Sequence, residues 1–234
     1  MRLRRRERGR PTVDAPLPRD GRRRVVIVAG PSGAGKSRLA AHLQDRHGWP
    51  IVRLDDFYRD GDDPSLPTLP IGVPDWDNPR SWHADAAVQA LVDLCRNGVV
   101  DLPTYDISSS RAVGHSVVTA EPGQLILAEG IFAAEIIEAL VEADVLAAAY
   151  CVHAGPWLTF CRRLIRDVAE RRKSPWVLWR RGLILRRQEP EIVARHVRLG
   201  AQPLSATEAM TAVTALVGTT PDIMGRYSIN QGDT

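Results

Sequence analysis

The sequence predicts an α/β fold with a doubly wound, mostly parallel sheet, and two observations indicate it. Apolar runs typical of buried strands recur along the chain, at residues 25–29, 51–54, 124–128 and 145–152. Helical patterns stand between these runs, and such alternation gives right-handed crossovers and a parallel sheet. Gly30, Asp55 and Glu129 follow or end three of the runs. Because ligands of such sheets bind beyond the carboxyl ends of the strands, we expect these residues to meet at one site.

The segment after the first predicted strand reads GPSGAGKS and matches the pattern G-x-x-x-x-G-K-[ST]. In this P-loop pattern, backbone N–H groups surround phosphate oxygens, the lysine neutralises the β- and γ-phosphates and the hydroxyl binds Mg²⁺. One of only two lysines in the chain stands here, whereas arginine occurs 29 times. The pattern therefore predicts ATP and Mg²⁺ as cofactors, with these candidate residues: Gly30, Ser32, Gly33, Ala34, Gly35, Lys36 and Ser37.

A helix is predicted from the glycine-rich loop to about His47, ending at Gly48. The second strand, residues 50–54, delivers Asp55 to the same edge of the sheet. We interpret Asp55 as the base that takes the proton of an acceptor hydroxyl. A helix cap or a water-mediated Mg²⁺ ligand is the alternative role, and the adjacent Asp56 is interpreted as structural.

The stretch from residue 59 to 79 is crowded with Pro, Gly and Asp, and it is too long for an ordinary connection. We expect a loop on the substrate side. Within it, Asp77 is a candidate to bind two neighbouring hydroxyls of a diol, and a turn-forming role is the alternative. An amphipathic helix follows over residues 84–95 and closes at Asn97-Gly98.

Two short strands, at residues 99–102 and 113–119, are predicted to flank the segment 103–111. Tyr105 in this segment either stacks on a planar group or packs in the core. The next buried strand ends at Glu129, where a charge is costly without a cation. Ser37 and Glu129, with Asp55 nearby, would suffice for Mg²⁺, which takes few protein ligands.

The last third of the chain is predicted to be mainly helical. A helix over residues 133–141 precedes the strand 145–152, and basic helices are expected from Pro156 to about residue 171 and over residues 175–188. These form a helical lid at about residues 163–190. Arg163 and Arg166 share one helix face, which either closes over the phosphates or is a solvated face. A last short strand is predicted at 194–199, and a helix over 205–217 begins with the capping-box pattern Ser205-x-x-Glu208.

Composition indicates one P-loop domain at residues 25–217 within the 234-residue chain. The net charge is +3, but ten arginines stand in residues 1–24, which we expect to form a disordered tail. Residues 218–234 are expected to form a second tail.

No stretch approaches the roughly 20 apolar residues of a membrane span. The cysteines, Cys95, Cys151 and Cys161, lack metal-site spacing and are typical of a reducing cytoplasm, so we expect a cytoplasmic protein.

Six motifs occur in this order: GPSGAGKS, LDDFYRD, DWDNP, PTYD, AEGI and RRLIRDVAERRKSP. Together they resemble the uridine kinase branch of the phosphoribulokinase/uridine kinase family over residues 25–175. The resemblance implies an ATP-dependent kinase of a nucleoside 5′-hydroxyl. It places the catalytic aspartate on Asp55, ribose binding on Asp77, base stacking on Tyr105 and the metal-side glutamate on Glu129. It also implies substrate contacts for Tyr58 and Arg163, and phosphate contacts for Arg163, Arg166 and Arg171.

Two departures from that family concern the acceptor pocket. The stretch 107–111 is one residue shorter and has Ser110 near the place of a histidine that helps to read the pyrimidine, and the usual F-D-H-P is W-D-N-P here. Another hydroxylated acceptor therefore stays open: a modified nucleoside, a pantothenate-like molecule or a sugar phosphate. Residues 58–80 hold Arg59 and Arg80 against five aspartates, which favours a neutral acceptor.

A rival from another class is a non-catalytic nucleotide-binding regulator whose Arg-rich tail contacts nucleic acid. We expect instead a small-molecule nucleoside as the partner, with neither nucleic acid nor membrane involved. Formation of a homo-oligomer stays open.

Overall fold

The computed structural model describes residues 20–155 and 189–217. Its centre is a sheet of five strands in the order β2-β5-β1-β6-β7, and every neighbouring pair is parallel. The strands are β1 (Arg24–Ala29), β2 (Ile51–Arg53), β5 (Leu125–Glu129), β6 (Leu146–Val152) and β7 (Gln202–Leu204). The predicted α/β class with a parallel sheet is confirmed.

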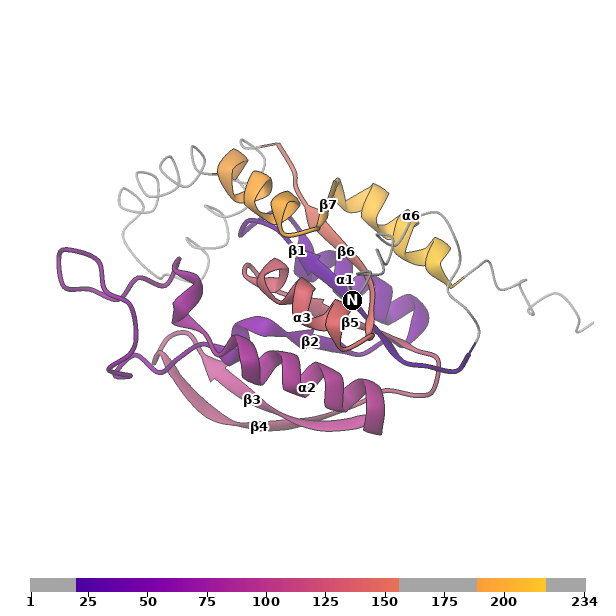
Figure 1. The fold of residues 1–234 in the computed structure, drawn as a ribbon, viewed down its shortest axis with the longest axis horizontal. Helices are drawn as coiled ribbons and strands as arrows, with labels where there is room; N and C mark the ends of the chain where they lie inside the picture. Colours follow the sequence, from indigo (N-terminus) through magenta and orange to yellow (C-terminus); the bar gives the residue numbers. More distant parts are fainter. Residues whose placement is uncertain (1–19, 156–188, 218–234) are drawn as a thin grey trace, which may run out of the picture.

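Alternate residues of β1 face two separate cores, as the period of a strand requires. Val25 and Ile27 belong to the core beneath α2 (Ala84–Asn97), η3 (Ala133–Ile136) and α3 (Ile137–Glu142). Val26 and Val28 belong to the core beneath α1 (Lys36–His47) and α6 (Ala206–Leu216). Helices therefore cover both faces of the sheet (Figure 1), and this is why β1 is apolar and buried from Val25 to Ala29.

Three predicted helices end or begin where the sequence indicated. α1 and α2 end at Gly48 and Gly98, both left-handed, whose N–H groups donate to the Gln44 and Leu94 carbonyls. α6 begins with the predicted capping box, in which Ser205 and Glu208 exchange side-chain and backbone hydrogen bonds.

The hairpin after α2 is longer than predicted. β3 (Val99–Asp106) and β4 (Arg111–Thr119) pair in antiparallel fashion, so the predicted strand 99–102 continues to Asp106. Pro103, the residue after the predicted end, cannot donate to a ladder. It is tolerated here, opposite His115, because a two-stranded ribbon consists of edges, where proline is allowed.

The strand predicted at residues 194–199 is wrong, because the structure has a helix over residues 189–198. Glu189 and His196 are buried on it and Val193 is partly buried, a spacing of three to four residues that belongs to a helix. The last strand is β7, which follows this helix and extends the sheet beyond β6.

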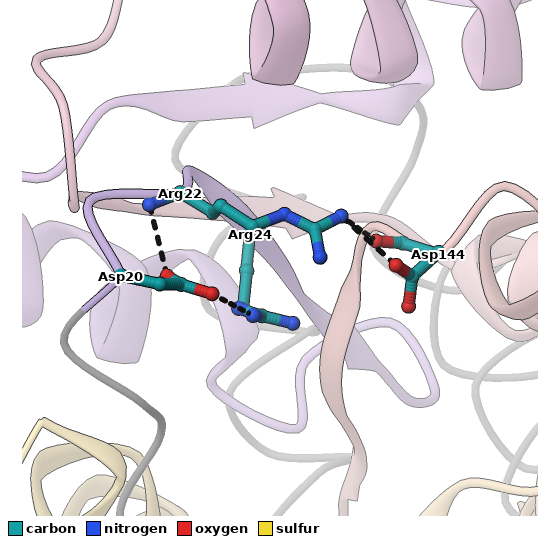
Figure 2. A network of polar contacts seen from close by, with 4 residues as sticks. All are labelled: Asp20, Arg22, Arg24 and Asp144. Carbon is teal, nitrogen blue, oxygen red and sulfur yellow. Dashed lines mark hydrogen bonds and ion pairs between the residues drawn. The ribbon is translucent and has the colours of Figure 1, made fainter.

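The chain enters β1 through a network of charged side chains (Figure 2). Arg24 pairs with Asp20 at 2.7 Å, and Asp20 also accepts the Arg22 N–H at 3.0 Å. The Arg22 guanidinium in turn binds the carboxylate of Asp144 at 3.0 Å and its carbonyl at 2.9 Å, in the turn between α3 and β6. Residues 22 and 23, assigned above to the disordered tail, therefore contact the domain: Arg22 binds Asp144, and Arg23 donates to the Ala120 carbonyl at 2.7 Å.

Several expectations lie outside the described residues: the tail at 1–19, the lid helices at 156–188 with Arg163, Arg166 and Arg171, Cys161, and the segment 218–234. Cys95 and Cys151 are buried and free. Within the described part of the chain, no helix is both long and apolar enough to cross a membrane.

Candidate active site

The glycine-rich loop joins β1 to α1 at the carboxyl end of the sheet. Gly30 has a φ of 143°, and a Cβ there would lie 2.2 Å from the carbonyl oxygen of Val152 in the neighbouring strand β6. No residue but glycine fits this approach. Lys36 is buried, and its Nζ donates to the carbonyls of Gly30 at 2.9 Å and Pro31 at 3.2 Å. The ammonium group is thus fixed at the loop, where a phosphate would meet it.

The hydroxyl of Ser37, in the first turn of α1, faces the carboxylate of Glu129. Its Oγ lies 3.1 Å from Oε1 and 3.1 Å from Oε2. Glu129 ends β5, which is paired with β1 so that Val28 stands opposite Glu129. Two residues far apart in the sequence are thereby brought together by the sheet register, as the prediction required.

Asp55 lies at the same edge of the sheet, in the short helix η1 (Leu54–Phe57) that follows β2. The register of β2 places Arg53 opposite Glu129, so Asp55 stands just beyond that pair. Backbone packs closely against it: a Cβ on Gly130 would lie 3.3 Å from Oδ1 of Asp55 and 2.9 Å from the Cβ of Leu54.

Burial raises the pKa of both Asp55 and Glu129 above the usual carboxyl range. The nearby Lys36 ammonium opposes the rise at both sites, and the Asp55 charge adds to it at Glu129. Two partly desolvated carboxylates beside one ammonium group form a site that favours a further cation. Hydroxyl and carboxylate oxygens are the hard ligands that Mg²⁺ prefers.

No group of three or more His, Cys, Asp or Glu side chains that could hold a metal ion occurs within residues 20–155 and 189–217. A magnesium site does not need such a group. Mg²⁺ commonly uses one or two carboxylates together with water and substrate phosphates. Ser37 and Glu129, with Asp55 nearby, fit that description.

An aromatic cluster centred on Tyr58 adjoins Asp55. The ring of Tyr58 lies 5.8 Å from Trp76, 5.9 Å from Tyr105 and 6.1 Å from Phe132, measured between ring centroids. Burial raises the pKa of Tyr58 most, followed by the charges of Asp55 and Asp77. The Tyr58 hydroxyl is thus within electrostatic reach of both carboxylates, and the cluster forms an apolar wall next to Asp55.

Tyr105 packs as a core residue in this cluster. It is 9% exposed, its N–H donates to Asp56 at 3.1 Å, and its hydroxyl donates to the Arg59 carbonyl at 3.0 Å. These contacts are those of a packed side chain, and stacking of Tyr105 on a planar group stays a prediction. Asp56 has the structural role expected of it, since it holds the backbone of β3.

Asp77 is exposed in a turn, in which the Asn78 N–H donates to the Asp75 carbonyl at 3.3 Å. The guanidinium of Arg59 is already paired with Asp63 at 3.1 Å and with the Arg80 carbonyl at 2.9 Å. Residues 58–80 therefore contribute aromatic side chains and carboxylates. Of their two arginines, Arg59 is already paired through its guanidinium.

Ser37 and Glu129 are in contact, Asp55 lies at the same edge of the sheet, and Tyr58 and Tyr105 belong to one aromatic cluster. The charge of Asp77 acts on Tyr58. One feature was not foreseen from the sequence. His196 is buried next to Cys151, with 3.5 Å between Nδ1 and Sγ. No sequence signal pointed to it, because a lone histidine has no pattern.

Comparison with known proteins gives a consistent assignment. Residues 25–175 match the model of the phosphoribulokinase/uridine kinase family. A uridine kinase of Staphylococcus carnosus (strain TM300) is 30% identical over 159 residues, which cover 64% of this chain and 71% of that protein. A protein of Arabidopsis thaliana named inorganic pyrophosphatase TTM2 is 29% identical over 152 residues, 64% of this chain and 21% of its own length.

Among solved structures, one described as a fructose transport system kinase of Silicibacter sp. TM1040 matches with a TM-score of 0.55 at 17% identity, and the match covers 80% of this chain and 90% of that one. This match supports the fold. The family match extends over more than half of the chain and includes the glycine-rich loop, Asp55 and Glu129. The chain is a P-loop small-molecule kinase and belongs to the phosphoribulokinase/uridine kinase family.

Proposed function

We propose that this kinase transfers the γ-phosphate of ATP to the 5′-hydroxyl of a pyrimidine ribonucleoside, uridine or cytidine. The observation that carries the proposal is the position of Asp55. Its carboxylate stands at the carboxyl edge of the sheet, where the Lys36 charge opposes the rise of its pKa and its own charge helps to raise the pKa of Tyr58. A base between a phosphate loop and an apolar wall is suited to an acceptor that carries both a hydroxyl and a planar ring.

In the proposed reaction, the 5′-oxygen of the acceptor forms a bond to the γ-phosphorus while the bond from that phosphorus to the bridging oxygen of ADP breaks. The acceptor proton passes to a carboxylate oxygen of Asp55. The raised pKa of Asp55 makes it a better proton acceptor than an exposed aspartate, because base strength follows pKa. Lys36 stabilises the charge on the phosphates.

Ser37 and Glu129 would hold Mg²⁺, with Asp55 nearby. When bound, Mg²⁺ supplies charge neutralisation at the β- and γ-phosphate oxygens. The Ser37 hydroxyl and the Glu129 carboxylate already lie 3.1 Å apart, so both oxygen ligands are close together before the ion binds. Arg163, Arg166 and Arg171 are proposed to contact the phosphates from the lid.

The acceptor is proposed to be neutral because Arg59 is engaged by Asp63 and by the Arg80 carbonyl. A phosphorylated acceptor would require cations that are not already paired. Asp77 is proposed to bind the 2′- and 3′-hydroxyls, and the aromatic wall of Tyr58 and Tyr105 to border the base. The relative named uridine kinase supports this choice.

A coupled ADP-release assay with a panel of acceptors tests the proposal. The panel contains uridine, cytidine, adenosine, pantothenate and a hexose phosphate, each at several concentrations with Mg-ATP. The proposal expects turnover with uridine or cytidine at least about tenfold higher in kcat/KM than with the other compounds, a difference of about 1.4 kcal/mol. Preference for another acceptor overturns the substrate assignment. ATP binding without turnover on any acceptor indicates the regulator instead.

A further inference from the structure

Arg53, the last residue of β2, belongs to the same face of the sheet as Glu129. The register of β2 against β5 forms these pairs: Ile51–Leu127, Val52–Ala128 and Arg53–Glu129. The first pair packs in the core beneath α1, and the second belongs to the core on the opposite face. Because side chains alternate along a strand, the third pair returns to the face covered by α1.

This face carries the proposed magnesium site. The hydroxyl of Ser37, in the first turn of α1, lies 3.1 Å from both carboxylate oxygens of Glu129. Arg53 stands one strand further along the sheet, and neighbouring strands are about 4.8 Å apart. An extended arginine side chain is longer than this spacing, so its guanidinium can reach past Glu129 towards the phosphate loop.

The guanidinium of Arg53 is available to a ligand. The side chain is exposed, and among residues 20–155 and 189–217 it makes no hydrogen bond and no ion pair. Arg59, by contrast, is paired with Asp63 at 3.1 Å. Burial raises the pKa of Asp55 and of Glu129, and the charge of Arg53, after that of Lys36, opposes the rise at both. This agrees with the place that the strand register gives to Arg53.

The position of Arg53 favours one phosphate over the others. Ser37 and Glu129, as proposed ligands of Mg²⁺, mark the side of the β- and γ-phosphates. Asp55, as the proposed base, marks the acceptor oxygen, which attacks the γ-phosphorus in line with the bond that breaks. Arg53 stands opposite Glu129 and two residues before Asp55. The group that lies between these two markers is the γ-phosphate.

We propose that Arg53 binds the phosphoryl group that this kinase transfers, first as the γ-phosphate of ATP and then on the product. The planar guanidinium presents two parallel donors to phosphate oxygens, which a lysine ammonium does not. Negative charge spreads over the γ-phosphoryl oxygens in the transition state, so the same contact would stabilise it. The inference rests on the proposed roles of Asp55, Ser37 and Glu129.

Nucleotide titration of Arg53→Gln, with no acceptor present, tests the inference. ADP lacks the γ-phosphate, so we expect Kd for Mg-ATP to rise at least about tenfold, or about 1.4 kcal/mol, and Kd for Mg-ADP to stay within about threefold. Retained Mg-ADP binding also shows that the variant is folded. Arg53→Lys keeps the charge but not the planar fork, and its Kd for Mg-ATP should be intermediate.

Arg46→Gln is the matched control for the loss of one positive charge. Arg46 is exposed in the last turn of α1, at the opposite end of the helix from the phosphate loop. This variant should bind both nucleotides as the wild type does. If Arg46→Gln weakens Mg-ATP binding as much as Arg53→Gln does, the effect belongs to net charge and the inference is overturned.

The comparison of the two nucleotides separates a contact at the γ-phosphate from an effect on the metal ligands. Mg-ADP also requires Ser37 and Glu129 in the proposed site, so an effect of Arg53 through Glu129 would weaken Mg-ADP and Mg-ATP equally. Equal weakening therefore overturns the inference, and so does unchanged binding of both nucleotides.

A phosphate on the acceptor is the other source of the same chemistry, and kinetics with a hexose phosphate distinguish it. If Arg53→Gln binds both nucleotides normally and raises KM only for the hexose phosphate, Arg53 belongs to the acceptor pocket and the inference fails. The nucleotide titrations need neither acceptor nor turnover. Normal turnover by Asp55→Asn would thus contradict the proposed base, while the difference between ATP and ADP still reports on Arg53.

Discussion

The hydroxyl of Ser37 lies 3.1 Å from both carboxylate oxygens of Glu129. One hydroxyl proton is thus shared by two acceptors at the place where the first turn of α1 meets the end of β5. The contact links the phosphate loop to the neighbouring strand. It also assembles two hard oxygen ligands beside Lys36, and this arrangement is the basis of the proposed magnesium site.

Lys36→Ala should abolish most turnover while the protein remains folded. The ammonium donates to the loop carbonyls at 2.9 and 3.2 Å, so it is positioned to meet the β- and γ-phosphates. Steady-state kinetics and circular dichroism on the same preparation check the result. Lys36→Arg is a useful second variant, because the guanidinium keeps the charge but not the compact shape. Wild-type turnover by Lys36→Ala would remove the loop from the mechanism.

The acceptor should be recognised as a ribonucleoside. A site that binds a hydroxyl leaves polar groups unpaired when that hydroxyl is missing, so uridine should exceed 2′-deoxyuridine in kcat/KM by at least about tenfold. Asp77→Asn should reduce this ratio, while Asp75→Asn, two residues away in the same turn, should preserve it. Equal rates on the two nucleosides with the wild type would argue against the assignment of Asp77.

Asp55→Asn should raise the melting temperature of the nucleotide-free, metal-free protein at pH 7. Burial raises the pKa of Asp55, so the folded state binds its proton more tightly than the unfolded state does. As the pH rises from the pKa of Asp55 in the unfolded state to its higher pKa in the folded state, the free energy of unfolding falls. At pH 7 the buried, charged carboxylate therefore destabilises the folded state. Differential scanning calorimetry should show a gain of a few degrees, at about 2–4 °C per kcal/mol for a chain of this size.

The gain from Asp55→Asn should shrink as the pH falls through the pKa of Asp55, where the wild-type carboxyl becomes neutral as well. A melting temperature that is unchanged or lower at pH 7 would mean that the Asp55 charge is already compensated in the free protein.

His196 should make the protein sensitive to acid. Burial, followed by the charges of Lys36 and Arg195, lowers its pKa from 6.5 to about 4. The unfolded state therefore takes up a proton first, and stability is lost as the pH falls from 6.5 to about 4, by about 3 kcal/mol at most. Urea unfolding at pH 7, 5.5 and 4.5 should show a steeper loss for the wild type than for His196→Gln.

The difference between the two proteins isolates the contribution of His196 from those of the other titratable groups, which both proteins share. Parallel curves for the wild type and His196→Gln would show that the ring does not titrate in this window.

Much of the phosphate site could be predicted from the sequence because its signals are local. The spacing in residues 30–37 fixes a loop between a strand and a helix, and the apolar runs before Asp55 and Glu129 place both at strand ends. Gly48 and Gly98 marked helix ends for the same reason. These features depend on a few adjacent residues and on the period of the element.

The contacts that cross the fold could not be predicted. His196 meets Cys151 through tertiary packing, and no local pattern records such a partner. The strand expected at residues 194–199 was wrong because a short apolar stretch cannot separate a strand from a half-buried helix. The hairpin β3–β4 was underestimated because Pro103 has the same local signature in an edge strand as in a loop.

The central claim is that Asp55 is the base of a phosphoryl transfer, and Asp55→Asn tests it most directly. The amide keeps the shape of the side chain and removes the proton acceptor, a role typically worth 10² to 10⁴ in rate. Asp56→Asn is the matched control, because its amide oxygen can still accept the Tyr105 N–H.

The measurement is kcat together with titration of Mg-ATP binding, on the same preparation of the wild type and of both variants. The account predicts that Asp55→Asn binds Mg-ATP as tightly as the wild type or slightly more tightly, and that its kcat falls by about 10² or more. Asp56→Asn should keep kcat within about threefold. Normal turnover by Asp55→Asn would contradict the account, and loss of Mg-ATP binding along with turnover would assign Asp55 to the metal instead.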